Sequence, residues 1–174
     1  MKIALISPKS SYLSNNPLFS EFWSNSKFTE SYRNNWSGLS PALLVIAALT
    51  PNTHEIEVID ENIESIDFSK TYDLVGITTM TQQSNRAYDI ADIFRKNGVS
   101  VILGGIHPTI MPEETLSGLG LDFIVYGEAE ISFPKIIQSL EQKGDLLNCP
   151  GVILFKNGHY IKTKPPELLQ NLDT

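Results

Sequence analysis

The stretch VILGGIHPT at residues 101–109 constrains the fold more than any other part of the chain. Its apolar residues run on without alternation, which is typical of a strand covered on both faces in a parallel sheet. Gly104 and Gly105 follow where this strand should end, at the edge where open α/β sheets bind their ligands. Glycine is also the usual turn residue. By itself, the pair therefore fits a simple turn as well as it fits a platform for a ligand.

Strand-like and helix-like segments alternate along most of the chain. Strands are predicted at 2–7, 55–59, 72–79, 99–103 and 122–126, and helices at 41–49, 84–97, 112–118 and 131–142. Ser40 and Pro41 have the residue types of an N-cap and a first helical position. The helix at 41–49 is apolar almost all round, so it is expected to pack against the sheet and something else. The alternation predicts an α/β fold with a doubly wound, five-stranded parallel sheet of the flavodoxin-like type.

The pattern changes after Pro150. The apolar segments 152–155 and 159–161 flank Asn157-Gly158, the residue pair that a type I′ hairpin turn requires. A C-terminal β-hairpin at 150–163 is therefore expected as an appendage to an α/β domain at 1–149. Residues 164–174 begin with an extended, proline-bound segment and are expected to be a linker toward a further, catalytic domain.

Residues 8–37 form a long insertion after the first strand. The segment is rich in Ser and Asn and also contains seven aromatic residues: Tyr12, Phe19, Phe22, Trp23, Phe28, Tyr32 and Trp36. This aromatic density is unusual for a disordered linker. Two interpretations stay open, a loop that packs its rings onto the domain, and a cap over a ligand or a contact surface for another domain.

Composition narrows the functional class. A net charge of -7 without a cluster of Lys and Arg argues against nucleic-acid binding. Cys149 is the only cysteine, which excludes a disulfide framework and a cysteine-held cluster within these residues and favours a reducing, cytoplasmic setting. The apolar run near the N-terminus stops at Ser7-Pro8, too short for a membrane span.

Several common sites are missing their required residues. The first strand is followed by Ser7-Pro8-Lys9, not by the Gly-x-Gly-x-x-Gly of a dinucleotide site. No aspartate ends the third strand as in a phosphoacceptor domain, and no nucleophile has a partner base. Ser10, Ser11 and Ser14 leave a flavodoxin-like phosphate loop open. Three predicted strand ends remain, Thr78-Thr79, 104–109 and 127–130, and their small residues and free amides suit a broad, neutral ligand.

Five pieces in order carry a family resemblance: DLVGIT at 73–78, RAY at 86–88, VILGGIHPT at 101–109, PEE at 112–114 and VYGEAE at 125–130. Together they resemble the N-terminal cobalamin-binding domain of cobalamin-dependent radical S-adenosylmethionine enzymes. That family includes carbon methylases and anaerobic magnesium-protoporphyrin monomethyl ester cyclases. The match is strongest from Tyr72 to Pro134.

The resemblance implies cobalamin at the carboxyl edge of the sheet, with its nucleotide tail between sheet and helices and its corrin amides on the strand-end loops. The contacts it implies are Thr78, Thr79, Gly104, Gly105, His107, Thr109, Gly127 and Glu128. For His107, a loop-ordering imidazole is an equal alternative. No catalytic residue and no metal ligand is predicted, since Glu113, Glu114 and Glu128 have the positions of acidic residues at helix N-termini.

Two departures from wider patterns shape the expected chemistry. Residues 8–37 contain no histidine, so bound cobalamin is expected base-off, without a histidine of that loop on cobalt. The family's Cys-x-x-x-Cys-x-x-Cys is absent, so the [4Fe-4S] cluster and S-adenosylmethionine are expected only in a separate catalytic domain of the same polypeptide, for methyl transfer or cyclisation. A cofactor-less interaction domain of the same fold and a flavodoxin-like flavin carrier stay open as alternatives.

Overall fold

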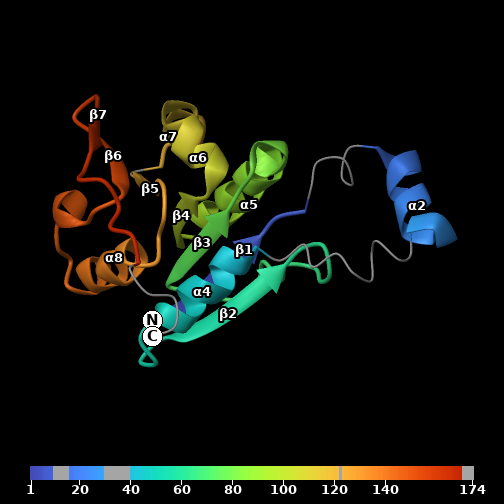
Figure 1. Ribbon diagram of the computed structural model, residues 1–174, viewed down its shortest axis with the longest axis horizontal. Coiled ribbons are helices and arrows are strands. Elements are labelled where there is room, and N and C mark those ends of the chain that lie inside the picture. The colour runs from blue at the N-terminus through green and yellow to red at the C-terminus, as the bar shows by residue number, and fades with distance from the viewer. Residues whose placement is uncertain (10–15, 30–39, 122, 170–174) are drawn as a thin grey trace.

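A four-stranded parallel sheet forms the centre of the molecule (Figure 1). The computed structural model describes residues 1–9, 16–29, 40–121 and 123–169. The strands β1 (Lys2–Ser7), β2 (Glu55–Asp60), β3 (Leu74–Thr78) and β4 (Ser100–Gly104) lie in the order β2-β1-β3-β4. All three pairings are parallel, so the carboxyl ends of the strands meet at one edge, as the sequence predicts.

Helices cover both faces of this sheet, which explains the unbroken apolar character of its strands. Ile3 and Leu5 of β1 pack in a cluster with α4 (Pro41–Leu49) and α8 (Ser132–Glu141). Ala4 and Ile6 point the other way, into a cluster with α5 (Ser84–Lys96) and α7 (Pro112–Leu119). Successive side chains of β1 thus point to opposite faces of the sheet, and the core has two layers.

The prediction of a fifth parallel strand has to be corrected. A strand β5 exists at Phe123–Val125, but it pairs antiparallel with β6 (Val152–Lys156), which continues to β7 (His159–Lys162) in a separate three-stranded sheet. The buried residues Val152, Ile153 and Leu154 supply β5 with its partner. In the described part of the chain the parallel sheet therefore has four strands, and the hairpin is continuous with β5.

The predicted turns and helix ends mostly agree with the structure. Asn157 and Gly158 have φ of 54° and 79°, as a type I′ turn requires. Pro41 begins α4 after Ser40, although the Ser40 hydroxyl makes no capping hydrogen bond. A short helix α6 (Ile106–Ile110) was not predicted, and it forms directly after the glycine pair.

The described part of the aromatic insertion is helical. Residues 17–25 form α2 (Pro17–Asn25), which Asn16 caps by accepting a hydrogen bond from the Phe19 amide. None of its residues is buried, Phe19 stacks on Trp23, and Figure 1 shows α2 standing apart from the sheet. The rings of α2 therefore do not pack into the core. Tyr12, Tyr32 and Trp36 lie outside the described residues.

Within the described ranges, no helix combines the length and the apolar character that a membrane crossing demands.

Candidate functional site

A pocket of about 90 Å³, partly open to solvent, lies over the carboxyl half of the sheet. Its walls are Ala42, Leu43 and Ile46 of α4 on one side and Phe133 of α8 on the other. Leu5, Ile77 and Ile102 of the sheet also line it. Since apolar side chains dominate this lining, the pocket suits a flat, uncharged group.

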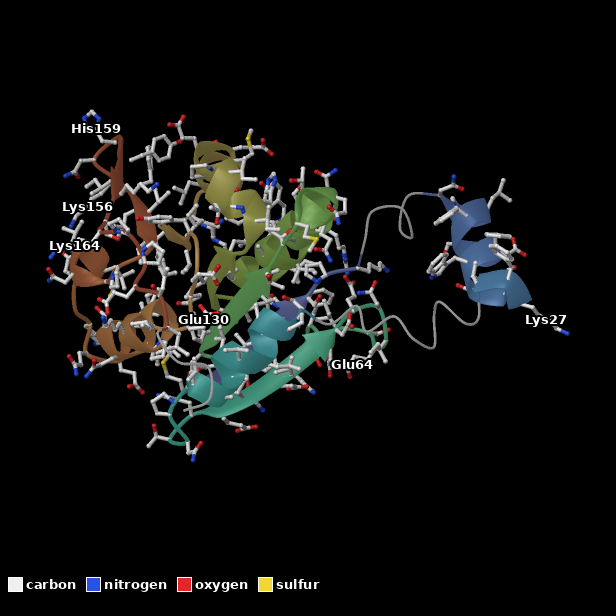
Figure 2. The ribbon with its side chains drawn as sticks, viewed as in Figure 1. Lys27, Glu64, Glu130, Lys156, His159 and Lys164 are labelled. Atoms are coloured by element: carbon white, nitrogen blue, oxygen red, sulfur yellow. The ribbon has the colours of Figure 1, made fainter. Side chains whose placement is uncertain are left out.

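Five of the eight predicted site residues line this one pocket: Thr78, Gly104, Gly105, Gly127 and Glu128. They come from the ends of β3 and β4 and from the loop between β5 and α8. Residues 127–130 of that loop, which we call the pocket loop, also contribute Ala129 and Glu130 to the lining. Figure 2 shows Glu130 near the middle of the main body, away from the hairpin tip that carries His159. The parallel sheet thus brings together strand ends that are far apart in sequence.

The other three predicted residues, Thr79, His107 and Thr109, do not line the pocket but connect its loops. The Thr79 amide donates to the Gly104 carbonyl at 3.0 Å, and the His107 amide donates to the Thr79 carbonyl at 3.1 Å. The Thr109 hydroxyl donates to the Gly105 carbonyl at 2.7 Å and accepts from the Gly127 amide at 3.0 Å. The three strand ends are therefore tied into one unit.

The site glycines are glycine for different reasons. Gly105 has φ of 98°, and a Cβ there would lie 3.0 Å from Thr78 Oγ1 and from the Thr79 backbone, so this residue makes the turn. Gly104 has no positive φ, and a Cβ there would meet Val125 only at 3.8 Å. Backbone strain does not require glycine at 104. The lack of a side chain at this lining position instead lets a ligand approach the backbone closely.

His107 is a buried link between three helices. Its side chain is 3% exposed, and Nε2 lies 2.8 Å from the hydroxyl of Tyr88 on α5 and 3.6 Å from Glu114 of α7. Burial raises the pKa of Tyr88, and the Thr115 hydroxyl 3.3 Å away lowers it in part. Nδ1 of His107 is buried without a hydrogen-bond partner. This environment matches the loop-ordering alternative for His107.

The carboxyl end of β1 is fixed by a charged cluster beside the site. Glu61 accepts hydrogen bonds from the Arg86 guanidinium and from the Lys9 amide, and this pairing with Glu61 raises the pKa of Arg86. The side-chain amide of Gln83 donates a hydrogen bond to the Pro8 carbonyl at 2.5 Å. Within the described ranges, no group of three or more His, Cys, Asp or Glu side chains is arranged to hold a metal ion.

The lining residues that the sequence did not predict come from α4, from α8, from the pocket loop and from the strands, among them Gly76 in β3. A glycine inside a buried strand is a signal of close approach, and a Cβ at Gly76 would lie 3.0 Å from Leu5 Cδ2. The apolar character of α4 was a second signal, because only Leu43 is buried and Leu44 is 51% exposed. Glu128 does not begin α8 as predicted, since that helix starts at Ser132 and Glu128 lies in the pocket loop.

Comparisons with known proteins agree with this geometry. A family model described as the B12 binding domain matches residues 39–137. Over 90 residues the chain is 48% identical to the bacteriochlorophyllide d C-8(2)-methyltransferase of Chlorobaculum tepidum. The aligned stretch covers 51% of this chain and 20% of that enzyme.

Solved structures resemble the fold over almost the whole chain. The cobalamin-dependent S-adenosylmethionine radical enzyme OxsB, with aqua-cobalamin and S-adenosylmethionine bound, aligns with a TM-score of 0.73 at 16% identity, over 96% of this chain and 22% of that one. The radical S-adenosylmethionine methyltransferase TsrM from Kitasatospora setae, with cobalamin and a [4Fe-4S] cluster bound, aligns with a TM-score of 0.67 at 17% identity. This alignment covers 99% of this chain and 30% of the TsrM chain. The chain therefore spans less than a third of the length of each of these three proteins.

Proposed function

Because the chain belongs to the B12-binding domain family, we propose that it binds cobalamin at the carboxyl edge of its parallel sheet. The observation that carries the proposal is the apolar pocket that α4, α8 and Gly104 line together. The pocket takes the flat dimethylbenzimidazole end of the nucleotide tail. The corrin is far larger than the pocket and lies outside it, across the strand ends.

The eight residues then divide into two roles. Thr78, Gly104 and Gly105 offer a hydroxyl and bare backbone to the cofactor, and Gly127 and Glu128 face it from the pocket loop. Thr79, His107 and Thr109 hold the loops in register through the hydrogen bonds described above. A cofactor of this breadth depends on many such contacts placed in advance, because each loop that must be ordered on binding weakens affinity.

The positions of the three histidines support binding without a protein histidine on cobalt. His54 precedes β2 at the opposite edge of the sheet, where its Nδ1 lies 3.2 Å from the N-terminal amine. His159 is in the hairpin, and Nε2 of buried His107 contacts Tyr88. Since His54 and His159 lie away from the strand ends and His107 is buried against Tyr88, we expect none of them to ligate cobalt.

When bound, cobalamin supplies a cobalt that carries a transferable methyl group. The chain's own part is to hold the cofactor and to leave its lower face without a protein nitrogen. We place the iron-sulfur cluster and S-adenosylmethionine in a separate catalytic domain, as the larger size of the radical enzymes OxsB and TsrM supports. Methyl transfer is favoured over cyclisation by the similarity to the bacteriochlorophyllide methyltransferase.

Equilibrium dialysis against hydroxocobalamin tests the proposal, with flavin mononucleotide dialysed in parallel. We expect cobalamin to accumulate on the protein side, with the absorption spectrum of the base-off form. After reduction, the paramagnetic resonance spectrum of cobalt should show no splitting from a protein nitrogen.

The matched variants are Gly104→Leu, which fills the space above the sheet edge, and Gly118→Leu, at a helical position with nothing within 4 Å of an added Cβ. The first should abolish retention of cobalamin and the second should not. Equal cobalamin concentration on both sides with the wild-type chain contradicts the proposal and favours a cofactor-less interaction domain. Retention of flavin alone favours the flavin carrier.

A further inference from the structure

The segment 163–167, which we call the C-terminal strap, runs back across the main body after β7. Its Thr163 amide donates to the Val152 carbonyl at 2.9 Å, and its Lys164 carbonyl accepts from the Gly151 amide at 2.8 Å. The Tyr126 hydroxyl lies 3.1 Å from the carbonyl oxygens of both Thr163 and Lys164. The strap is thus bonded to the residues on either side of the β5–β6 ladder.

Pro166 brings the strap onto the pocket loop itself. A Cβ at Gly127 would lie 2.7 Å from Pro166 Cγ, and a Cβ at Gly151 would lie 3.1 Å from Pro166 Cβ. Both glycines have positive φ, 67° and 73°. The absence of a side chain at Gly127 therefore serves the proline ring as well as the pocket. Farther along, Glu167 pairs with Lys135 of α8 at 2.8 Å.

The pocket loop is held from two sides. On one side the Gly127 amide donates to Thr109, which in turn donates to the Gly105 carbonyl at the end of β4. On the other side Pro166 packs against Gly127. Residues 127–130 line the pocket between these two attachments, so a shift of the strap must move the pocket loop or break one of them.

We infer that Pro166 is a positioning residue for the pocket, and that docking of the strap and binding of the cofactor stabilise each other. The inference rests on the proposed function, because cobalamin is the ligand whose binding is coupled. Coupling between two sites is reciprocal. Docking of Pro166 strengthens cobalamin binding, and bound cobalamin in turn holds the strap in place by the same factor. The state of the pocket is thereby passed to the chain beyond the strap.

The test uses the full chain with two proline substitutions. Pro166→Ala removes the ring atoms that meet Gly127, and Pro165→Ala is the matched control, since Pro165 is exposed and does not reach either glycine. We expect Pro166→Ala to raise the Kd for cobalamin about fivefold, near the lower end of measured couplings, and Pro165→Ala to leave it within about twofold.

The reciprocal measurement needs no substitution. Amide hydrogen exchange of Gly151, whose N–H donates to the strap, should slow about fivefold when the wild-type chain is saturated with cobalamin, by the same coupling. In Pro166→Ala, cobalamin at saturation should protect Gly151 less than in wild type, whereas a merely structural proline would leave this ligand-dependent protection unchanged. Two results would overturn this inference but leave the proposed function intact. One is a Kd for cobalamin in Pro166→Ala equal to that of wild type, and the other is unchanged exchange at Gly151 in a chain that binds cobalamin. Failure of the wild-type chain to bind overturns the proposed function with it.

Discussion

Gly104 and Gly105 are adjacent, but different physical constraints act on them. Gly105 is required by its own backbone, because its φ of 98° and its contact with residues 78–79 leave no room for a Cβ. Gly104 is free of both constraints. The sequence left a choice between turn and ligand platform for the pair. The structure makes Gly105 the turn residue, and we propose Gly104, which lines the pocket, as the platform.

Paired alanine substitutions separate these two roles. Gly105→Ala should lower the free energy of unfolding by about 1–3 kcal/mol, the usual cost of a strained positive φ. Gly104→Ala should leave that free energy within about 1 kcal/mol of wild type. It should nonetheless weaken cobalamin binding about tenfold, or 1.4 kcal/mol, because the added methyl enters the pocket. Urea unfolding and equilibrium dialysis measure the two quantities, and equal loss of stability in both variants would contradict the division.

Glu57 gives the fold a pH dependence that is independent of the pocket. The Lys70 ammonium at 2.6 Å, and then the Tyr72 hydroxyl, hold the pKa of Glu57 below its ordinary value of 4.5. A lowered pKa in the folded state contributes stability that is complete above the unfolded value and lost as pH falls through the folded one.

Glu57→Gln should therefore be less stable than wild type at neutral pH, and the difference should shrink as pH falls below 4.5. Urea unfolding across that range measures it. Glu21→Gln, on the exposed side of α2, is the control and should show no such convergence. A difference that grows toward acid pH would show that the pairing with Lys70 and Tyr72 is not its origin.

Secondary-structure elements were predictable where their signals are local. The strands 2–7 and 55–60, the helix beginning at Pro41 and the turn at Asn157-Gly158 each follow from neighbouring residues. The partner of β5 does not, because its choice of β6 depends on buried residues that come after α8. The environment of His107 is hidden for the same reason, since its Tyr88 contact comes from another helix.

The hairpin offers a clean test of turn chemistry. Gly158 has φ of 79° and open space around an added Cβ, so Gly158→Ala changes backbone strain and nothing else. It should destabilise the β5–β6–β7 sheet by about 1–2 kcal/mol, the cost of the left-handed conformation. Gly118→Ala, in helix α7 and equally uncrowded, should instead stabilise by about 0.5–1 kcal/mol. Thermal unfolding of both variants checks the opposite signs.

The two core layers connect the pocket to the stability of the whole molecule. Cys149 is 5% exposed and belongs to the same apolar cluster as the pocket residues Leu43 and Phe133. Burial raises the pKa of its thiol, so the reactive thiolate is disfavoured in the folded chain. Alkylation of Cys149 therefore reports on opening of this layer.

Cobalamin at 100 times its Kd should slow iodoacetamide labelling of Cys149 by up to about 100-fold, because binding stabilises the closed state by about 2.7 kcal/mol. Mass spectrometry of labelled protein over time gives the rate. Labelling in urea, where the layer is open with or without ligand, is the control. A chain that binds cobalamin yet labels at an unchanged rate would show that this layer opens without disturbing the pocket.

The strand order has a consequence for how such a domain diversifies. From β1 the chain crosses through α4 on one face of the sheet, and from β3 it crosses through α5 on the other face, so the connections diverge between these adjacent strands. The aromatic insertion leaves β1 beside this switch point, where Glu61 holds Lys9, and the family match begins only at residue 39. The insertion therefore follows β1 at the edge of the sheet that we propose for cobalamin, and it interrupts none of the four paired strands. Its side chains could change at this edge while the pairing of the sheet stays the same.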